Sequence, residues 1–390
     1  MPIESSSVEL TLGLGGIEAR TKSLYDLDTP FILSERSEGM GIYAAYLPDG
    51  VSYPGNSSDK PQPLVNNRRV VRDSRETDLD PEGESAGADT RLWVCSPATY
   101  WPYGGHLSLF AYAPYDETAA GDSLRITTAY ASNAWPALSF TVRKDPRRQV
   151  DLLGGVALDK TSGGDTYRHL QGSVDLSLHH LLTWVDIRAK GNSEKAGFND
   201  WMTANFSPSP YVGISSIRLD GILDSRTGHY ASTGFNWDDI PAAEDYAQSY
   251  ELSFENGHFK DLATAHLTVG TDLDYQQLLI GDGDDVHGNS SRLFLMPQEL
   301  SLSATMTVEY GIFTSPSSGV YTPALLYQAS FPIGNLRNAL DERINYTWGA
   351  GKHVVYELTL NMSEVSKCTV TATVSDWEAG YEHEHDKYLE

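Results

Sequence analysis

The stretch Tyr100-Trp-Pro-Tyr-Gly-Gly-His-Leu-Ser-Leu-Phe-Ala-Tyr-Ala-Pro114 decides the fold class of this chain of 390 residues. It opens on a turn over residues 100–105, because proline fixes φ and glycine permits positive φ. A short apolar run from His106 to Ala113 follows, and Pro114 ends it. A run of this length between two turn signals is too short for a typical helix, so it predicts a β-strand.

Period-two patterns that are typical of β-strands recur along the chain. Val8-Glu-Leu-Thr-Leu12 alternates apolar and polar residues, and Gly41–Leu47 is closed by the turn Pro48-Asp-Gly50. One segment, Asn335–Glu342, has helical spacing and predicts a short peripheral helix. Further strands are expected at Trp184–Arg188, Ile214–Leu219, Tyr250–Phe254, His266–Val269, Arg292–Met296 and Thr305–Tyr310.

The clearest alternation lies near the C-terminus, over residues 354–360 and 368–374. Each segment has one apolar face and one face on which threonine and glutamate predominate, which indicates a strand with one face on a core. The short connection over residues 361–367 predicts that the two strands form a hairpin. The apolar faces consist of Val354, Tyr356, Leu358, Leu360, Cys368, Val370, Ala372 and Val374.

Length and punctuation predict two domains. Roughly 100–200 residues make a typical domain, and the 34 glycines and 19 prolines are spread as expected for many short strands and turns. Periodicity is lost over residues 190–210, which we interpret as a linker. We therefore expect an all-β protein of two tandem β-sandwiches, residues 1–192 and 193–390, with the boundary between about 190 and 212.

The charge excludes several classes of partner. The formal net charge is −25, from 53 acidic and 28 basic residues. Phosphate backbones and anionic lipid surfaces attract basic proteins, so we expect no nucleic-acid partner and no electrostatic membrane binding. No run of about 18 apolar residues is present, and the polar start Met1-Pro-Ile-Glu-Ser-Ser-Ser7 lacks the apolar core of a signal peptide. The protein is either cytoplasmic or preceded by a leader outside this sequence.

Residue patterns that resemble chemical sites fail on inspection. Gly281-Asp-Gly-Asp-Asp-Val-His287 does not place oxygen ligands as a calcium loop requires, and Gly349-Ala-Gly-Lys352 lacks the remaining positions of a phosphate loop. His383 and His385 share one face of an extended segment, but two ligands do not make a specific zinc site. The sequence also lacks a Gly-x-Ser-x-Gly nucleophile elbow. We expect no catalytic residue, no metal and no cofactor.

The two cysteines, Cys95 and Cys368, cannot form a disulfide framework. We interpret Cys368 as a small apolar residue on the core face of a strand, and a disulfide between the two domains is the alternative.

Several blocks of sequence together resemble the fimbrillin-like proteins of the Bacteroidetes, the type V pilins. The block Tyr100–Pro114 is similar to the family's YWP-x-GG strand, and the other blocks follow in the family's order over residues 8–377. Those other blocks are Glu18-Ala-Arg-Thr21, Met40–Ala45, Asp151–Leu153, Val174–Leu182, Leu295–Gln298, Trp348–Lys352 with Val355-Tyr356, and Trp377.

The resemblance implies two transthyretin-like, Greek-key sandwiches and a non-enzymatic structural or adhesive subunit of cell-surface fimbriae. It also implies export as a lipoprotein to the outer membrane, with membrane attachment only through an N-terminal lipid upstream of this sequence, so it favours a missing leader. The implied partners are other fimbrial subunits and a host or bacterial surface ligand.

The resemblance further implies assembly by donor-strand exchange, in which a protease removes an N-terminal strand and a segment of another subunit fills the opened groove. We expect the removable strand to contain Val8, Leu10 and Leu12, with proteolytic processing at Arg20. The donor is expected to come from the C-terminal hairpin, with the inward residues Val354, Tyr356, Leu358, Leu360, Val370 and Val374.

Two other functions remain open on the sequence. A cell-surface glycan-binding β-sandwich would expose coplanar aromatic rings, for which the candidates are Trp101, Tyr103, Trp135 and Trp237. A β-rich hydrolase would need convergent acids that no spacing in this acidic chain identifies. The acidic tail, residues 378–390, points to a tip or accessory subunit rather than a stalk subunit.

Overall fold

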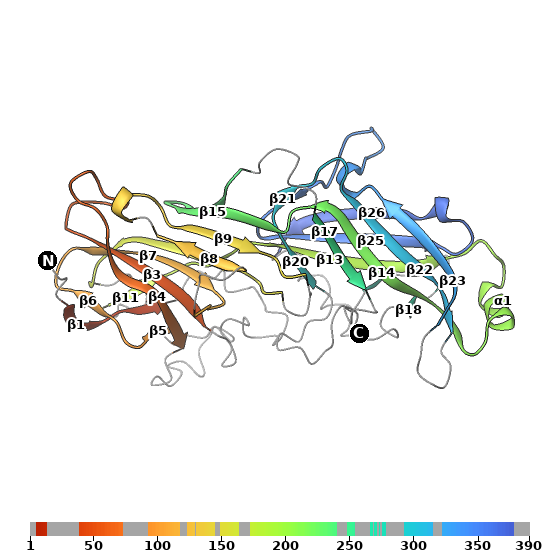
Figure 1. Cartoon of the computed structure of the whole chain (residues 1–390), viewed down its shortest axis with the longest axis horizontal. Helices are drawn as coiled ribbons and strands as arrows, with labels where there is room; N and C mark the ends of the chain where they lie inside the picture. The colour runs from red at the N-terminus through yellow and green to blue at the C-terminus, as the bar shows by residue number, and fades with distance from the viewer. Residues whose placement is uncertain are drawn as a thin grey trace, which may run out of the picture. The chain divides into compact units, whose positions relative to one another are not determined.

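A computed structural model describes residues 5–13, 39–72, 93–117, 123–128, 130–144, 149–163, 172–239, 248–253, 266–267, 269–270, 273, 275–277, 292–314 and 322–377. Strands predominate in these residues, and they include a single α-helix, α1 (Phe198–Asn205) (Figure 1). The prediction of an all-β sandwich fold is confirmed.

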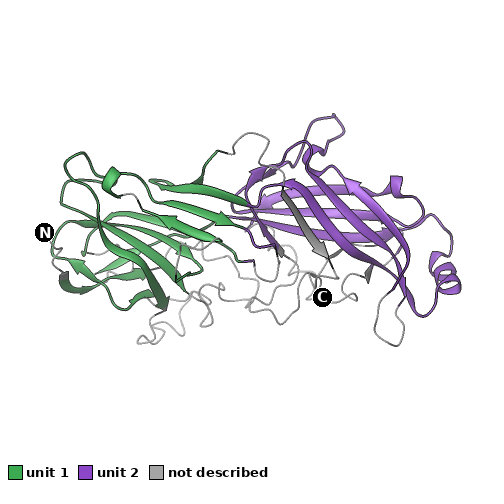
Figure 2. Cartoon of the chain, in the orientation of Figure 1, with its two compact units in different colours: residues 1–141, 150–181, 225–239 green, residues 142–149, 182–224, 240–390 purple. Residues whose placement is uncertain are grey.

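The chain forms two compact units, which Figure 2 colours green and purple. Unit 1 comprises Met1–Thr141, Val150–Leu181 and Ser225–Asp239, and unit 2 comprises Val142–Gln149, Leu182–Asp224 and Ile240–Glu390. This division differs from the expected single boundary between residues 192 and 193. One segment after that boundary belongs to unit 1, and one segment well before it belongs to unit 2. The first is the strand at residues 225–231, which pairs with residues 137–141 of unit 1. The second is the segment 142–149, which is bonded within unit 2 through Val142 N–H to Asp224 O, 2.7 Å.

Unit 1 contains an eight-stranded sheet in the order β11-β2-β5-β4-β3-β7-β10-β12, a four-stranded sheet in the order β16-β15-β9-β8, and the pair β1-β6. Its elements are β1 (Ser5–Glu9), β2 (Thr11–Gly13), β3 (Met40–Leu47), β4 (Gln62–Arg72), β5 (Trp93–Ser96), β6 (Tyr100–Pro102), β7 (His106–Ala113), β8 (Leu124–Thr127), the 3-10 helix η2 (Tyr130–Ser132), β9 (Ala137–Thr141), β10 (Leu153–Lys160), β11 (Ser173–Asp175), β12 (His179–His180), β15 (Ser225–Ala231) and β16 (Gly234–Trp237).

The stretch that decides the fold supplies β6, a turn and β7. All eight residues of β7 are buried, because this strand lies between β3 and β10 and is covered on both faces. The turn requires glycine at position 105, where φ is +74° and an added Cβ would lie 2.5 Å from the Leu47 carbonyl oxygen. The expected strand and its bounding turn are therefore confirmed.

Aromatic side chains fill the space between the two larger sheets of unit 1. The Phe110 ring from β7 lies 5.4 Å from the Tyr230 ring of β15, at an angle of 63°. The Tyr230 hydroxyl donates to the Ala111 carbonyl oxygen at 2.9 Å, and complete burial raises the pKa of this phenol. A neutral, hydrogen-bonded tyrosine thus joins the two sheets of the sandwich.

Unit 2 contains two five-stranded sheets. One has the order β19-β13-β25-β26 with β20 also paired to β13; the other has the order β17-β14-β22-β23 with β18 also paired to β14. The remaining pair is β21-β24. The elements besides α1 are β13 (Thr183–Asn192), β14 (Pro210–Ile222), β17 (Gln248–Ser253), β18 (His266–Leu267), β19 (Gln276–Gln277), β20 (Arg292–Leu295), β21 (Gln298–Glu299), β22 (Thr305–Thr314), β23 (Thr322–Phe331), η7 (Ile333–Asn335), β24 (Thr347–Trp348), β25 (Lys352–Asn361), η8 (Val365–Lys367) and β26 (Thr369–Asp376).

The C-terminal hairpin forms as the alternation predicts. β25 and β26 pair antiparallel from Lys352↔Asp376 to Thr359↔Thr369, and the threonines of β26 are exposed while its other residues are mostly half-buried. The Tyr310 hydroxyl of β22 donates to the Asn361 carbonyl oxygen at 2.8 Å, which links the hairpin to the other sheet of unit 2.

One local expectation and one alternative are wrong. Residues 335–342 do not form a helix: Asp341 N–H bonds to Asn338 O at 3.0 Å, which closes a turn in a small hairpin. A disulfide between Cys95 and Cys368 is absent, because both cysteines are free thiols, one in each unit. Cys368 is half-buried just before β26, and its Sγ lies 3.0 Å from the Tyr310 hydroxyl.

Candidate functional site

The N-terminal segment of the described chain completes the large sheet of unit 1. The alternating run 8–12 divides at Leu10, because β1 pairs with β6 whereas β2 inserts between β5 and β11. The insertion is antiparallel to β5 and parallel to β11. Leu10 and Leu12 are completely buried and Val8 packs at the edge of the same core cluster. The strand expected to be removable is therefore part of the core of unit 1.

Backbone hydrogen bonds fix this segment from both sides. Leu10 N–H donates to Thr99 O at 2.8 Å, and Thr11 N–H donates to Gly172 O at 3.1 Å. The buried indole of Trp101 also donates to Gly172 O, at 2.9 Å. Removal of residues 5–13 would leave the Thr99 carbonyl and the facing strands without these partners, while Gly172 O would keep the Trp101 indole. Unpaired backbone groups in a buried position destabilise the fold.

Gly172 shapes the slot in which the segment lies. Its φ is +87°, and an added Cβ would lie 2.4 Å from the Glu9 carbonyl oxygen. Only glycine combines this backbone conformation with such a close approach of a neighbouring chain. The roles of Thr99 and Gly172 were not predicted, since nothing local to either residue indicates a partner so far along the chain.

Cys95 on β5 faces the core beside this slot. Burial raises the pKa of its thiol to about 11, so the group is neutral at ordinary pH. A buried, protonated thiol is a poor nucleophile and acts as a small apolar residue.

The expected processing residue, Arg20, lies outside the described residues, so cleavage there stays a prediction. The acidic turn 281–287, His383 and His385 also lie outside the described residues. Within the described ranges, no three His, Cys, Asp or Glu side chains come together as a metal site.

The expected donor residues lie on two strands with different surroundings. Those of β25, which are Val354, Tyr356, Leu358 and Leu360, are completely buried, and the strand is paired to β13 on one side and β26 on the other. Val370 and Val374 of β26 are half-buried. Among the described strands β26 pairs only with β25, so it forms an edge of its sheet.

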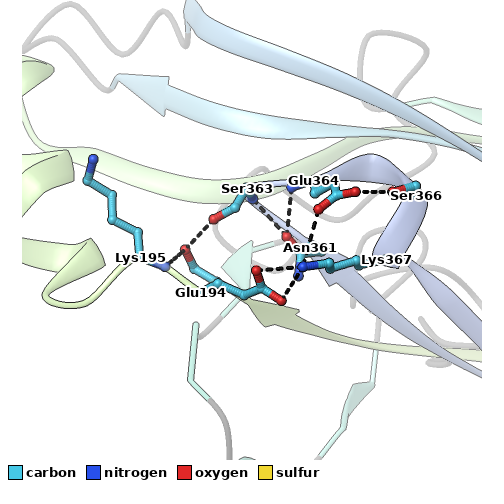
Figure 3. Close-up of polar contacts among 8 residues, drawn as sticks. Glu194, Lys195, Asn361, Ser363, Glu364, Ser366 and Lys367 are labelled. Carbon is cyan, nitrogen blue, oxygen red and sulfur yellow. Dashed lines mark hydrogen bonds and ion pairs between the residues drawn. The ribbon is translucent and has the colours of Figure 1, made fainter.

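A polar cluster fastens the turn between β25 and β26 to the end of β13 (Figure 3). Lys367 Nζ lies 2.6 Å from both carboxylate oxygens of Glu194 and 3.2 Å from Glu364 Oε2. Asn361 Oδ1 accepts the backbone N–H groups of Ser363 and Glu364, each at 2.8 Å. These ion pairs raise the pKa of Lys367, chiefly through Glu194, but the three side chains are exposed and water screens them.

The aromatic residues considered for glycan binding do not form a shared platform. Trp101 is buried. Trp135 packs edge-on against Tyr53, with ring centroids 4.9 Å apart, and Trp237 donates its indole N–H to Leu181 O at 2.7 Å. Tyr103 alone of the four is largely exposed, at 76%.

The N-terminal segment and β25 share a tetrapeptide. Glu9-Leu-Thr-Leu12 and Glu357-Leu-Thr-Leu360 have the same sequence, and in both the two leucines are completely buried. Each copy includes residues of a strand with one parallel neighbour and one antiparallel neighbour: β11 and β5 for the first, β13 and β26 for the second. Both copies thus place two completely buried leucines two residues apart.

Together these features describe an all-β sandwich protein whose N-terminal strand is built into a core. The chain belongs to the fimbrillin-like family, since the family model matches residues 73–377. Proteins of this family serve in fimbriae and cell adhesion, which are structural and adhesive roles at the cell surface. No curated protein matches the sequence.

The chain is similar to solved structures of fimbrial proteins, and the first of these shows the same fold. A fimbrial protein from Bacteroides vulgatus ATCC 8482 is 16% identical with a TM-score of 0.59, and the match covers 95% of this chain and 99% of that one. A fimbrilin (FimA) from Porphyromonas gingivalis W83 is 10% identical with a TM-score of 0.38, covering 96% and 99%. No helix in the described part of the chain is long and apolar enough to cross a membrane.

Proposed function

We propose that this chain is a subunit of cell-surface fimbriae that joins another subunit by strand exchange at the slot now filled by β2. The observation that carries the proposal is the place of β2, near the N-terminus yet paired with β5 on one side and β11 on the other. Proteolytic removal of the N-terminal segment after Arg20 would open this slot. The proposal includes an N-terminal lipid that anchors the subunit to the outer membrane. It also includes a ligand on a host or bacterial surface.

The opened slot would require a replacement strand. Burial of Leu10 and Leu12 stabilises unit 1 by about 1.5–3 kcal/mol for each side chain, and the exposed strand edges lose their backbone partners as well. A donor that restores two large apolar side chains two residues apart, together with the backbone ladder, recovers most of this free energy.

The C-terminal hairpin supplies the proposed donor. β25 repeats the tetrapeptide of the N-terminal segment, so it would supply the same two leucines two residues apart. β26 has a single neighbour among the described strands, so it can leave its sheet without separating β13 from β25. Side-chain pattern therefore favours β25 and accessibility favours β26, and the two segments can be tested separately.

Limited digestion with an arginine-specific protease tests the proposal. We expect a main cut after Arg20, read by intact mass, followed by oligomers that resist SDS. Arg20→Gln, as the matched control, should keep the chain intact and monomeric in SDS. Synthetic peptides of residues 352–361 and 368–377, added after the cut, should block oligomer growth according to which segment is the donor. A chain that is cut at Arg20 but retains its N-terminal segment and forms no SDS-resistant oligomer would contradict the proposal.

A further inference from the structure

A buried side chain follows directly after β26, although the strand itself contains none. The eight residues of β26 are either exposed or half-buried, including the inward Val370 and Val374. The next residue, Trp377, is only 7% exposed. The side chain that is buried most completely at this edge of the sheet therefore lies just beyond the end of the strand.

The Trp377 ring contacts two strands with which β26 does not pair. It stacks on Phe294 of β20, with ring centroids 5.6 Å apart and planes at 14°, and its centroid lies 5.7 Å from that of Trp184 of β13. Phe294 and Trp184 are partners in the register of these adjacent strands. Since β25 separates β26 from β13, the chain that leaves β26 crosses β25 and places its ring over the far strands.

A further ring continues this row of aromatic contacts. His353 of β25 stacks on Trp184 at a centroid distance of 3.6 Å and an angle of 13°, and both side chains are 4% exposed. They lie on the face opposite Val185 and Val354, because successive side chains of a strand alternate between faces. Phe294, Trp377, Trp184 and His353 thus form one aromatic clasp across this face of the sheet.

The backbone of Trp377 is anchored at the same place. Its N–H donates to Gly351 O at 3.0 Å, and Gly351 N–H donates to Leu182 O at 2.9 Å. The Thr183 hydroxyl at the start of β13 donates to Gly349 O at 2.8 Å. The turn before β25 therefore ties the backbone of the clasp to β13 as well.

We propose that Trp377 retains β26 in its sheet, so that opening of the aromatic clasp controls the release of β26 for strand exchange. The consequence for assembly rests on the proposed function, whereas the hold on β26 does not. A tryptophan buries a large apolar area, and this ring reaches strands that β26 itself cannot. The Lys352–Asp376 ion pair at the same end is exposed and solvated, so it holds the strand weakly.

Hydrogen exchange of the β26 amides in the uncleaved chain, read by mass spectrometry of peptides, tests the clasp. Trp377→Ala should raise the exchange rate at least about tenfold, because local opening of β26 then breaks no ring contacts. Phe294→Ala should act in the same direction although it lies on β20, and it should add little in the Trp377→Ala background. Trp377→Phe keeps an aromatic ring and should remain close to the wild type.

The matched control is Met306→Ala, which truncates a completely buried side chain on β22, in the other sheet of unit 2. It should lower the global stability of unit 2 and leave the local opening of β26 unchanged. Equal acceleration of β26 exchange by Met306→Ala would overturn the proposal, as would unchanged exchange in Trp377→Ala. Additive effects of Trp377→Ala and Phe294→Ala would also overturn it, since the two rings would then act independently.

Assembly after cleavage at Arg20 gives a second readout. Trp377→Ala should form SDS-resistant oligomers faster than the wild type, and equal rates would overturn control of release by the clasp. If β26 exchange is faster but neither chain forms such oligomers, the hold of Trp377 on β26 is supported and strand exchange is contradicted. The failure of one proposal is therefore distinguishable from the failure of the other.

Discussion

β25 contains one whole copy of Glu-Leu-Thr-Leu, whereas β2 contains only Thr11 and Leu12 of the other copy, and the two strands differ in the pairing that each supports. β25 holds β13 on one side and β26 on the other along its length, so its loss would divide a sheet of unit 2. β2 is short and joins only β5 and β11, and the order β5-β4-β3-β7-β10-β12 persists without it. The same tetrapeptide therefore lies within one central strand of unit 2 but is divided between β1 and β2 in unit 1.

Truncation of matched leucines should separate the two strands most clearly. Leu358→Ala is expected to lower the free energy of unfolding of unit 2 by about 2–5 kcal/mol, because a completely buried leucine leaves a cavity. Leu10→Ala should cost less, because detachment of β1 and β2 limits the loss to local unfolding. Urea denaturation followed by hydrogen exchange measures both quantities.

The exposed variant Leu326→Ala, on the edge strand β23, serves as the control and should change stability little. An equal cost for Leu10→Ala and Leu358→Ala, with no early exchange in β2, would show that β2 is as indispensable as β25.

Thiol labelling should give the next largest effect. The pKa of Cys95, raised by burial from 9.0 to about 11, lowers its thiolate fraction at pH 8 by about a hundredfold. Because burial keeps the Cys95 thiol neutral, Cys95 should react slowly with iodoacetamide. The half-buried Cys368 should react first. Loss of the N-terminal segment uncovers β5, and Cys95 should then label readily. Mass spectrometry of labelled peptides before and after cleavage checks this, and fast labelling of Cys95 in the uncleaved chain would contradict the burial of β5.

Gly172→Ala should weaken the β2 slot without touching β2 itself. The added methyl group meets the Glu9 carbonyl oxygen at 2.4 Å and stands at positive φ, so we expect a loss of about 1–3 kcal/mol and earlier release of the N-terminal segment. The fluorescence of Trp101, whose indole bonds to Gly172 O, reports the change. Gly50→Ala is the matched control, because φ there is +83° but the space around it is open. Equal effects of the two variants would assign the loss to backbone strain alone.

Local pattern predicted the strands, because period-two alternation states directly which face meets a core. It also predicted that Val8, Leu10 and Leu12 belong to a strand. It failed for residues 335–342, where leucine and alanine have helical spacing but the Asn338 side chain bonds the backbone of a turn instead. It also did not indicate the division of the N-terminal strand at Leu10.

The sequence pattern also did not predict which segments belong to the other unit. Residues 225–239 return to unit 1 because they pair with β9, a partner that periodicity does not name. The role of Gly172 was not predicted for the same reason. It depends on the close approach of Glu9, which is far away in the sequence. Prediction from one sequence therefore identifies strands and fails to place them.

The smallest effect is expected at the polar cluster that fastens the β25–β26 turn. Lys367→Met removes the ion pairs with Glu194 and Glu364, yet all three groups are exposed and solvated, so the melting temperature of unit 2 should not change measurably. Asn361→Ala is the sharper variant, because its side chain satisfies two backbone N–H groups of the turn, and it should destabilise the hairpin by about 1 kcal/mol. If Lys367→Met instead accelerates hydrogen exchange along β26 as much as Asn361→Ala does, charge rather than turn chemistry holds this hairpin in place.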